Sequence, residues 1–296
     1  MTIIDGQPAP RVLGVLGGMG PAAGVEFLRA FVDRWPGTRD QDHPRVVLHS
    51  EPGIHDRTAA LLGTGPDPTQ QIRAALQRLA ASEVDLVAVP CNTAFAFIDR
   101  FAHDLPVPVV HTVAATVVAA VRSAPAGAWL LATRGAVSAQ IYQARARAVG
   151  YRLLVPDQEC QRRVQGVVDI IKAGAVDRAV DPFLRVVRDL HARHRAPLLF
   201  GCTELPLVWR AAGQPVEVVD SVAALADECV ARLRAGGSGG DLLGAALGTT
   251  VGEYARLAAA GTGRRPVQAG VPVPRTDIRL TWGADGSDRP KPEGNV

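Results

Sequence analysis

Aromatic residues are scarce in this 296-residue chain, at 5% against 47% for all hydrophobic residues together. Long apolar runs are missing as well, because no segment approaches the roughly 18 consecutive apolar residues of a membrane-spanning helix. The N-terminal MTIIDGQPAPRV has neither the basic start nor the long apolar stretch of a secretory signal. We therefore expect a cytoplasmic protein without a membrane span, long enough for a sizeable core and for two domains.

An excess of charge of one sign is also missing. The formal net charge is +3, charged residues make up 21% of the chain, and the two signs are interspersed without a basic block. Because nucleic-acid-binding proteins concentrate positive charge on one face or segment, we expect no nucleic-acid partner.

Cysteine is rare and no Cys-x-x-Cys pair occurs. The four cysteines are Cys91, Cys160, Cys202 and Cys229. In a chain of this length and compartment we expect free thiols. His191 and His194 are three residues apart without a third ligand beside them, so we expect no metal site.

Strands and helices alternate along the N-terminal part of the chain. A strand over 11–18 leads into a glycine-rich turn, and a proline opens a helix expected over 21–35. A strand over 45–51, a helix over 67–82 and a buried strand over 84–89 follow. This alternation predicts an α/β fold with parallel sheets and helices on both faces.

The same order of elements then starts again. It comprises a strand with a glycine-bearing turn over 127–136, a helix over 138–150, and strands over 151–157 and 197–201. The separation of Cys91 from Cys202 nearly equals that of Gly17 from Thr133, which indicates an internal duplication. We predict two three-layer α/β/α lobes, each with a thiol at the corresponding place.

The predicted boundaries of the two lobes follow from this duplication. The first lobe comprises 11–111 and 217–235, and the second comprises 112–216. Residues 236–296 are rich in Gly and Pro, and we expect a partly disordered C-terminal extension with one short helix.

Cys91 and Cys202 each follow a predicted strand and precede a predicted helix. In open α/β sheets, ligands bind outside the carboxyl ends of the strands. The N–H groups of a helix start would lower the pKa of a thiol there and bind a substrate carboxylate. Two thiols on opposite sides of one ligand are suited to removing a proton from one face of a carbon and returning one to the other.

Less specific explanations exist for these motifs. Either cysteine alone would be interpreted as a buried structural thiol, as we interpret Cys160 and Cys229; the matched pair favours a function. The segment GGMGPA fits a loose dinucleotide-binding pattern, but its proline and the lack of a suitable acidic residue argue against it. We interpret this turn as a pocket lining and expect no cofactor.

Several short motifs occur in order: GGMGP (17–21), DQDHP (40–44), DRT (56–58), PCNTA (90–94), VPDQ (155–158), GCTELPL (201–207) and VVDS (218–221). Together they resemble the aspartate racemase branch of the aspartate/glutamate/hydantoin racemase superfamily, over about 11–235. The resemblance implies a cofactor-independent amino-acid racemase with two pseudosymmetric lobes, an active site in the cleft between them and a homodimeric assembly. Its substrate would be a small amino acid.

The resemblance also implies roles for individual residues. Cys91 and Cys202 match the proton-transfer thiols. Arg57, whose guanidinium fork suits a carboxylate, matches the residue that binds the substrate side chain, assisted by Lys172. The complete set of predicted substrate-binding residues is Met19, Arg57, Asn92, Thr93, Thr133, Lys172, Thr203 and Glu204.

Two positions depart from the family pattern. Phe95 stands where the family commonly has His, and Val168 where it often has Tyr; we expect both to make the pocket less polar. The substrate therefore stays open between aspartate and another acidic, aspartate-like amino acid. Two alternatives also stay open: a decarboxylase or cis-trans isomerase of a small dicarboxylic acid with the same fold, and a non-catalytic ligand-binding homologue. Two intact thiols favour racemisation.

Overall fold

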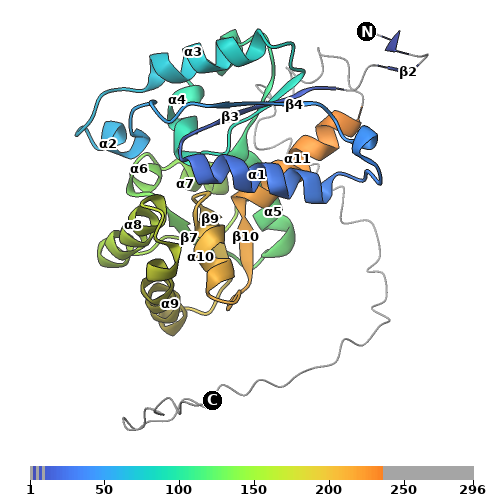
Figure 1. Ribbon diagram of the computed structural model, residues 1–296. Coiled ribbons are helices and arrows are strands. Elements are labelled where there is room, and N and C mark those ends of the chain that lie inside the picture. The colour runs from blue at the N-terminus through green and yellow to red at the C-terminus, as the bar shows by residue number, and fades with distance from the viewer. Residues whose placement is uncertain (1–2, 5–6, 9–10, 236–296) are drawn as a thin grey trace, which may run out of the picture. The chain divides into compact units, whose positions relative to one another are not determined.

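The computed structural model describes residues 3–4, 7–8 and 11–235 (Figure 1). The predicted C-terminal extension, 236–296, lies outside the described residues. At the N-terminus, β1 (Ile3–Ile4) pairs with β2 (Gln7–Pro8) in antiparallel fashion. Among the described residues, no helix is long and apolar enough to cross a membrane.

The first sheet contains four parallel strands in the order β4-β3-β5-β6. Their bounds are β3 (Leu13–Gly17), β4 (Val46–Ser50), β5 (Leu86–Ala88) and β6 (Val109–Val110). The two central strands are buried along their whole length, which is why their sequences are continuous apolar runs rather than alternating ones.

Helices cover both faces of the first sheet, as the sequence predicts. They are α1 (Pro21–Arg34), α2 (Arg57–Leu61), α3 (Thr69–Ala80), α4 (Phe95–Ile98) and α11 (Ser221–Arg234), with short 3-10 turns η1 (Asp40–Asp42), η2 (Asn92–Ala94) and η3 (Ala102–Asp104). Phe27 and Phe31 of α1 pack with Leu225 of α11 against one face, and Leu76 of α3 packs against the other.

The second sheet repeats the arrangement of the first. Read from one edge, its order is β8-β7-β9-β10, and these strands have the places of β4, β3, β5 and β6 in the first sheet. This repetition confirms the predicted two-lobed parallel α/β fold. The elements are α5 (Thr112–Ser123), β7 (Ala128–Ala132), α6 (Arg134–Ser138), α7 (Ile141–Ala148), β8 (Leu153–Leu154), α8 (Gln158–Lys172), α9 (Val176–Arg193), β9 (Leu198–Gly201), α10 (Leu205–Ala211) and β10 (Val218–Asp220).

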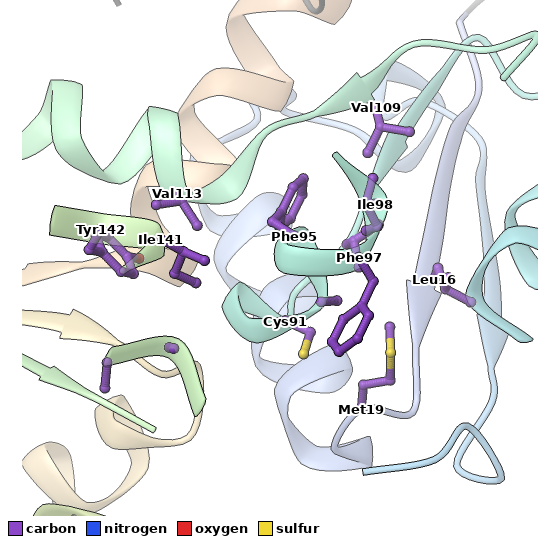
Figure 2. Close-up of a cluster of buried hydrophobic side chains, with 14 of the residues drawn as sticks. Leu16, Met19, Cys91, Phe95, Phe97, Ile98, Val109, Val113, Ile141 and Tyr142 are labelled. Atoms are coloured by element: carbon purple, nitrogen blue, oxygen red, sulfur yellow. The ribbon is translucent and has the colours of Figure 1, made fainter. Parts of the chain in front are cut away.

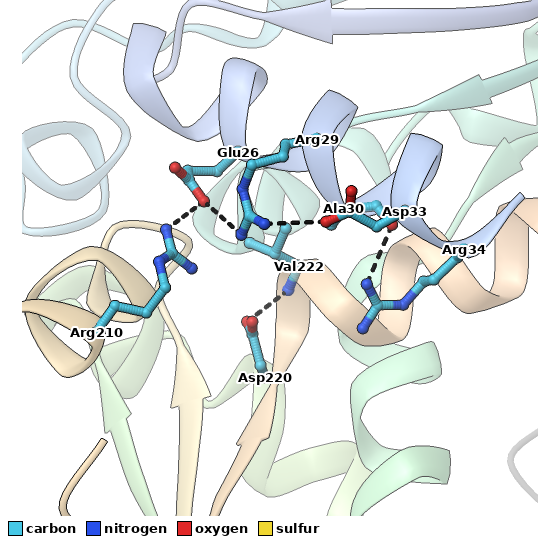
Figure 3. Close-up of polar contacts among 8 residues, drawn as sticks. All are labelled: Glu26, Arg29, Ala30, Asp33, Arg34, Arg210, Asp220 and Val222. Atoms are coloured by element: carbon cyan, nitrogen blue, oxygen red, sulfur yellow. Dashed lines mark hydrogen bonds and ion pairs between the residues drawn. The ribbon is translucent and has the colours of Figure 1, made fainter. Parts of the chain in front are cut away.

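The polypeptide passes from the second sheet to the helices of the first at Asp220–Ser221. We expected 217–235 in the first lobe, but β10 pairs with β9, where Val218 is opposite Leu198. The following helix, α11, packs in the first lobe against α1 (Figure 1). Asp220 begins this helix by accepting a hydrogen bond from Val222 N at 2.8 Å, as Figure 3 shows. The other predicted lobe boundaries stay predictions.

One hydrophobic cluster is continuous between the lobes. It contains Phe95 and Phe97 of the first lobe together with Ile141, Tyr142 and Leu199 of the second. Figure 2 shows part of this cluster, with Met19 and Cys91 on the segments of the first lobe and Tyr142 on α7.

Two further contacts join the lobes outside this cluster. Glu26 of α1 forms an ion pair with Arg210 of α10 (Figure 3). Gly135 of α6 lies directly against α2, because a Cβ at this glycine would be only 2.8 Å from the Cα of Thr58. The lobes are therefore in close contact beside the pocket described next.

Candidate active site

All ten residues that the sequence predicts for the site line one pocket. They are Met19, Arg57, Cys91, Asn92, Thr93, Thr133, Lys172, Cys202, Thr203 and Glu204. The pocket also contains Asp56, Thr58 and Gly201, for which the sequence predicts no role. Most of these residues follow the carboxyl ends of the central strands β3, β5, β7 and β9, where parallel sheets place their ligands.

The Cys91 segment leaves β5 and enters the short turn η2. Asn92 is buried here and has two partners: its Nδ2 donates to Ser221 Oγ at 3.0 Å, and its Oδ1 accepts from Tyr142 OH at 2.6 Å. The hydroxyls of Thr93 and Thr133 are 2.9 Å apart, which joins the first lobe to the second. The side chains of this segment are therefore held in place from both lobes.

The Cys202 segment follows β9 and contains a buried carboxylate. Cys202 Sγ donates a hydrogen bond to Glu204 Oε2 at 2.9 Å, and Glu204 Oε1 accepts from Gly20 N at 3.3 Å. Thr203 Oγ1 donates to the carbonyl oxygen of Pro90 at 3.2 Å. Since Gly20 and Pro90 belong to the first lobe, this segment also receives contacts from both lobes.

The state of Cys202 differs from our expectation that a helix start would lower the pKa of both thiols. Burial raises the pKa of Cys202 well above its usual value, and the Glu204 carboxylate raises it further, while Lys172 opposes them. The helices that follow the two cysteines are short, at four residues in α4 and seven in α10, so their dipoles are weak. Cys202 is therefore a protonated thiol in this pocket.

Two cationic side chains face the same pocket. Burial acts to lower the pKa of Lys172, but the neighbouring acidic groups, Glu204 foremost, raise it. Lys172 is therefore a cation in electrostatic contact with both cysteines.

Arg57 is the second cation and is buried at the start of α2. Its NH1 group donates to the carbonyl oxygens of Ile54 and His55 at 3.0 and 2.9 Å, which fixes the plane of the guanidinium. Its Nε is buried without a hydrogen-bond partner, and no carboxylate pairs with Arg57 among the described residues. A buried donor and an unpaired cation both favour an anionic ligand, because leaving them unmatched is energetically costly.

The expectation that Phe95 and Val168 make the pocket less polar is wrong. Neither side chain lines the pocket. Phe95 stacks on the ring of His111 with centroids 4.3 Å apart, and Val168 is buried among the apolar side chains of the second lobe. The two departures from the family pattern therefore change core packing and not the surface that a ligand touches.

Cys160 and Cys229 are also buried outside this pocket, in two separate hydrophobic clusters. Burial raises the pKa of both thiols. No group of three or more His, Cys, Asp or Glu side chains suited to a metal ion occurs within the part of the chain that the structure describes.

The sequence matches the family model described as Asp/Glu/Hydantoin racemase over residues 16–229. The chain belongs to this racemase family. It is an amino-acid racemase of the Asp/Glu racemase family, and its reaction class is isomerisation.

Individual relatives agree with this racemase assignment. The broad specificity amino-acid racemase RacX of Bacillus subtilis (strain 168) is 24% identical over 226 residues, which cover 74% of this racemase and 96% of RacX. The aspartate racemase of Picrophilus torridus has a similar structure, with a TM-score of 0.67, 26% identity, and coverage of 76% of this chain and 94% of that one. The glutamate racemase of Thermus thermophilus shares the fold, with a TM-score of 0.54 at 24% identity over 77% of this chain and 82% of its own.

Proposed function

We propose that this racemase interconverts the two enantiomers of an acidic, aspartate-like amino acid by proton transfer between Cys91, the substrate α-carbon and Cys202, without a cofactor. The observation that carries the proposal is the pair of thiols in one pocket, beside two cations and one buried carboxylate. The expected homodimer and cytoplasmic location remain predictions.

In the proposed reaction the substrate α-carbon loses one proton and gains another on its opposite face. The Cys91 thiolate removes the α-proton from one face, which breaks the Cα–H bond and leaves its electron pair on the substrate. The Cys202 thiol then delivers its proton to the opposite face, and the new Cα–H bond completes the inverted enantiomer. For the mirror-image substrate the two cysteines exchange roles. No oxidation occurs, and the enzyme ends with its proton on the other sulfur.

Glu204 supports this assignment of roles in the resting enzyme. Its carboxylate accepts the S–H hydrogen of Cys202 at 2.9 Å, which keeps this sulfur in the acid form. When Cys202 must act as a base instead, the same carboxylate is placed to receive the proton, and the backbone N–H of Glu204 points to the sulfur and favours its thiolate. Glu204 thus connects the two directions of the reaction.

The α-proton of an amino acid is weakly acidic, so negative charge that develops on the α-carboxylate must be stabilised. Asn92, Thr93 and Thr203 line the pocket and are our candidates for binding this carboxylate. Donors already fixed before the reaction stabilise developing charge most effectively. The bonds of Asn92 to Tyr142 and Ser221 provide such fixation.

The preference for an acidic side chain rests on Arg57 and Lys172. Arg57 presents a fixed guanidinium with a buried, unpartnered Nε, and Lys172 adds a second positive charge. A second carboxylate on the substrate would pair with this positive region. A neutral side chain would leave the Arg57 donor without a partner.

The proposal is tested by incubating the protein with L- and D-amino acids in deuterated water without added pyridoxal phosphate. NMR follows exchange of the α-proton, and chiral chromatography follows inversion. We expect both, fastest for aspartate or another acidic amino acid. An Arg57→Lys variant retains the charge but loses the fork, and we expect about a tenfold lower kcat/KM for acidic substrates, with a smaller change for alanine.

Other outcomes would point to other functions of the same pocket. Loss of carbon dioxide, or geometric isomerisation of a dicarboxylic acid without inversion, would replace racemisation by one of the alternative reactions. Binding of acidic amino acids that raises the Tm, with no exchange across the panel, would indicate a non-catalytic homologue.

A further inference from the structure

Tyr142 is fully buried on α7 and lines no part of the pocket, yet it contacts the segments of both pocket cysteines. Figure 2 shows it beside Ile141, on a different segment from Cys91. The sequence predicts no role for it. Its contacts on the two sides of the pocket are of different kinds and are described in turn.

The first contact is a hydrogen bond to the Cys91 segment. Tyr142 OH donates to Asn92 Oδ1 at 2.6 Å across 50 positions of the sequence. Ser221 accepts one of the two amide hydrogens of Asn92. Together these bonds determine which way the amide faces, and they leave its second hydrogen for a substrate oxygen. Burial raises the pKa of Tyr142, so the hydroxyl is a permanent donor.

The second contact is close packing against the Cys202 segment. A Cβ at Gly201 would lie 2.7 Å from Cε2 of Tyr142, so the tyrosine ring rests directly on the glycine backbone that precedes Cys202. The same hypothetical Cβ would be 3.0 Å from the Cβ of Ala132, which means that the ring and β7 together enclose Gly201. The ring therefore supports the backbone directly before the second thiol.

We propose that Tyr142 is a positioning residue for racemisation, whose ring supports the Cys202 segment and whose hydroxyl orients Asn92 beside Cys91, so that one side chain sets how the two thiol segments face each other. The inference rests on the proposed two-thiol reaction. The inference needs both contacts. The ring packing alone would fit a tyrosine that only fills the core, and the hydrogen bond to Asn92 connects this side chain to the pocket.

The test compares Tyr142→Phe with a matched control, Tyr151→Phe. Tyr151 is buried in the same hydrophobic cluster, its hydroxyl donates to the carbonyl oxygen of Ala124 at 3.0 Å, and neither residue lines the pocket. Each variant keeps a ring and loses one buried hydrogen bond, so we expect similar decreases in Tm. We expect kcat to fall about tenfold for Tyr142→Phe with KM within about threefold, and to stay within about twofold for Tyr151→Phe.

A further variant asks whether Tyr142 acts through Asn92. Ser221→Ala removes the other partner of the same amide. If both partners serve one orientation, the double variant Tyr142→Phe/Ser221→Ala is impaired by less than the product of the single effects. Equal decreases in kcat for Tyr142→Phe and Tyr151→Phe, or single effects that multiply in the double variant, would overturn the proposal.

A measurement without substrate separates this inference from the proposed function. Dibromobimane becomes fluorescent when both of its ends react with thiols, and we expect it to link Cys91 to Cys202 in the wild-type protein. The rate should fall at least about threefold in Tyr142→Phe and stay unchanged in Tyr151→Phe. If the cross-link forms in the wild type and slows only in Tyr142→Phe, but the protein racemises nothing, the proposed function fails while the positioning of the two thiol segments by Tyr142 stands. Absence of the cross-link in wild type, or equal rates in both variants, refutes the positioning role.

Discussion

Cys91 follows β5 and Cys202 follows β9, the equivalent strands of the two sheets. Two residues further on, the first segment has Thr93 and the second has Glu204. Among the described residues, only Cys202 has a carboxylate within hydrogen-bond distance, and its pKa is raised. A duplicated fold thus brings two thiols to one pocket, and a single acidic residue makes them chemically unequal. We interpret this inequality as the division between acid and base in the resting enzyme.

The largest effect on racemisation is expected when one of the two pocket cysteines is replaced at a time. We expect racemisation to fall by about 10²- to 10⁴-fold in both Cys91→Ala and Cys202→Ala, because each variant lacks one proton carrier. In deuterated water each variant should still exchange the α-proton of one enantiomer without inverting it, and the two variants should act on opposite enantiomers.

The control for this pair is Cys160→Ala, since Cys160 is buried outside the pocket. Its racemisation rate should stay within about twofold of the wild type. If either single-cysteine variant racemised at the wild-type rate, or if both exchanged the same enantiomer, the two-thiol assignment would be wrong.

A smaller effect is expected when the acidic residue itself is neutralised. Glu204→Gln keeps the shape and the contact with Gly20, but it removes the charge that raises the pKa of Cys202. Because Lys172 remains, we expect the iodoacetamide labelling of Cys202 to shift to lower pH, as measured by mass spectrometry. We also expect kcat to fall about 10- to 100-fold, because the carboxylate that accepts the hydrogen of Cys202 is lost, while burial still raises the pKa of this thiol.

The labelling of Cys91 in the same protein is the internal control. It should change little, since Glu204 forms its hydrogen bond with the other sulfur. A pH profile for Cys202 identical to that of the wild type would show that the carboxylate does not control this thiol.

The smallest effect concerns the point where the polypeptide passes between the lobes. Burial raises the pKa of Asp220 to about 6, whereas an unfolded Asp titrates near 3.9. The native state therefore binds this proton more tightly, and stability falls as the pH rises from about 4 to about 6. Asp220→Asn keeps an oxygen for Val222 N. We expect its Tm to exceed that of the wild type by a few degrees at pH 8 and to equal it near pH 4.

Asp157→Asn offers a matched control for Asp220→Asn. Asp157 also begins a helix, α8, and accepts from Cys160 N at 2.8 Å, but this bond lowers its pKa. Its charge therefore stabilises the native state above the unfolded pKa, and this contribution is lost as the pH falls. Tm measured by calorimetry should fall or stay unchanged at pH 8 for this variant. An increase in both variants would contradict the assigned cause.

Local patterns were sufficient to predict the two lobes and the position of both cysteines at strand ends, whereas the roles of Arg57 and Lys172 came from the family resemblance. Apolar runs that end at Cys91 and Cys202 identify the central strands, and the expected helix over 21–35 is confirmed as α1 (Pro21–Arg34). Residues next to a strand end share the site because the sheet brings strand ends together. Proximity to strand ends and the parallel topology therefore predict the part of the lining that follows the central strands, and not Arg57 or Lys172, which lie on α2 and α8.

Contacts between the lobes could not be predicted in this way. The bonds of Asn92 join residues 50 and 129 positions apart, and no local pattern specifies such pairs. The wrong expectation for Phe95 has a related cause, since the rotation of a four-residue helix is set by what packs around it. The sequence predicts residues 217–220 in the first lobe, but β10 pairs with β9 of the second sheet, a contact between segments about 20 positions apart.

Gly135 has a practical consequence for engineering this enzyme. Its missing side chain is what allows α6 to lie against Thr58, a residue of the pocket lining. A single methyl group at this position would force α2 away from α6, and because Thr58 directly follows Arg57, the guanidinium would move with it. One carbon atom at the rim would therefore change the shape of the pocket from a position that carries no reactive group.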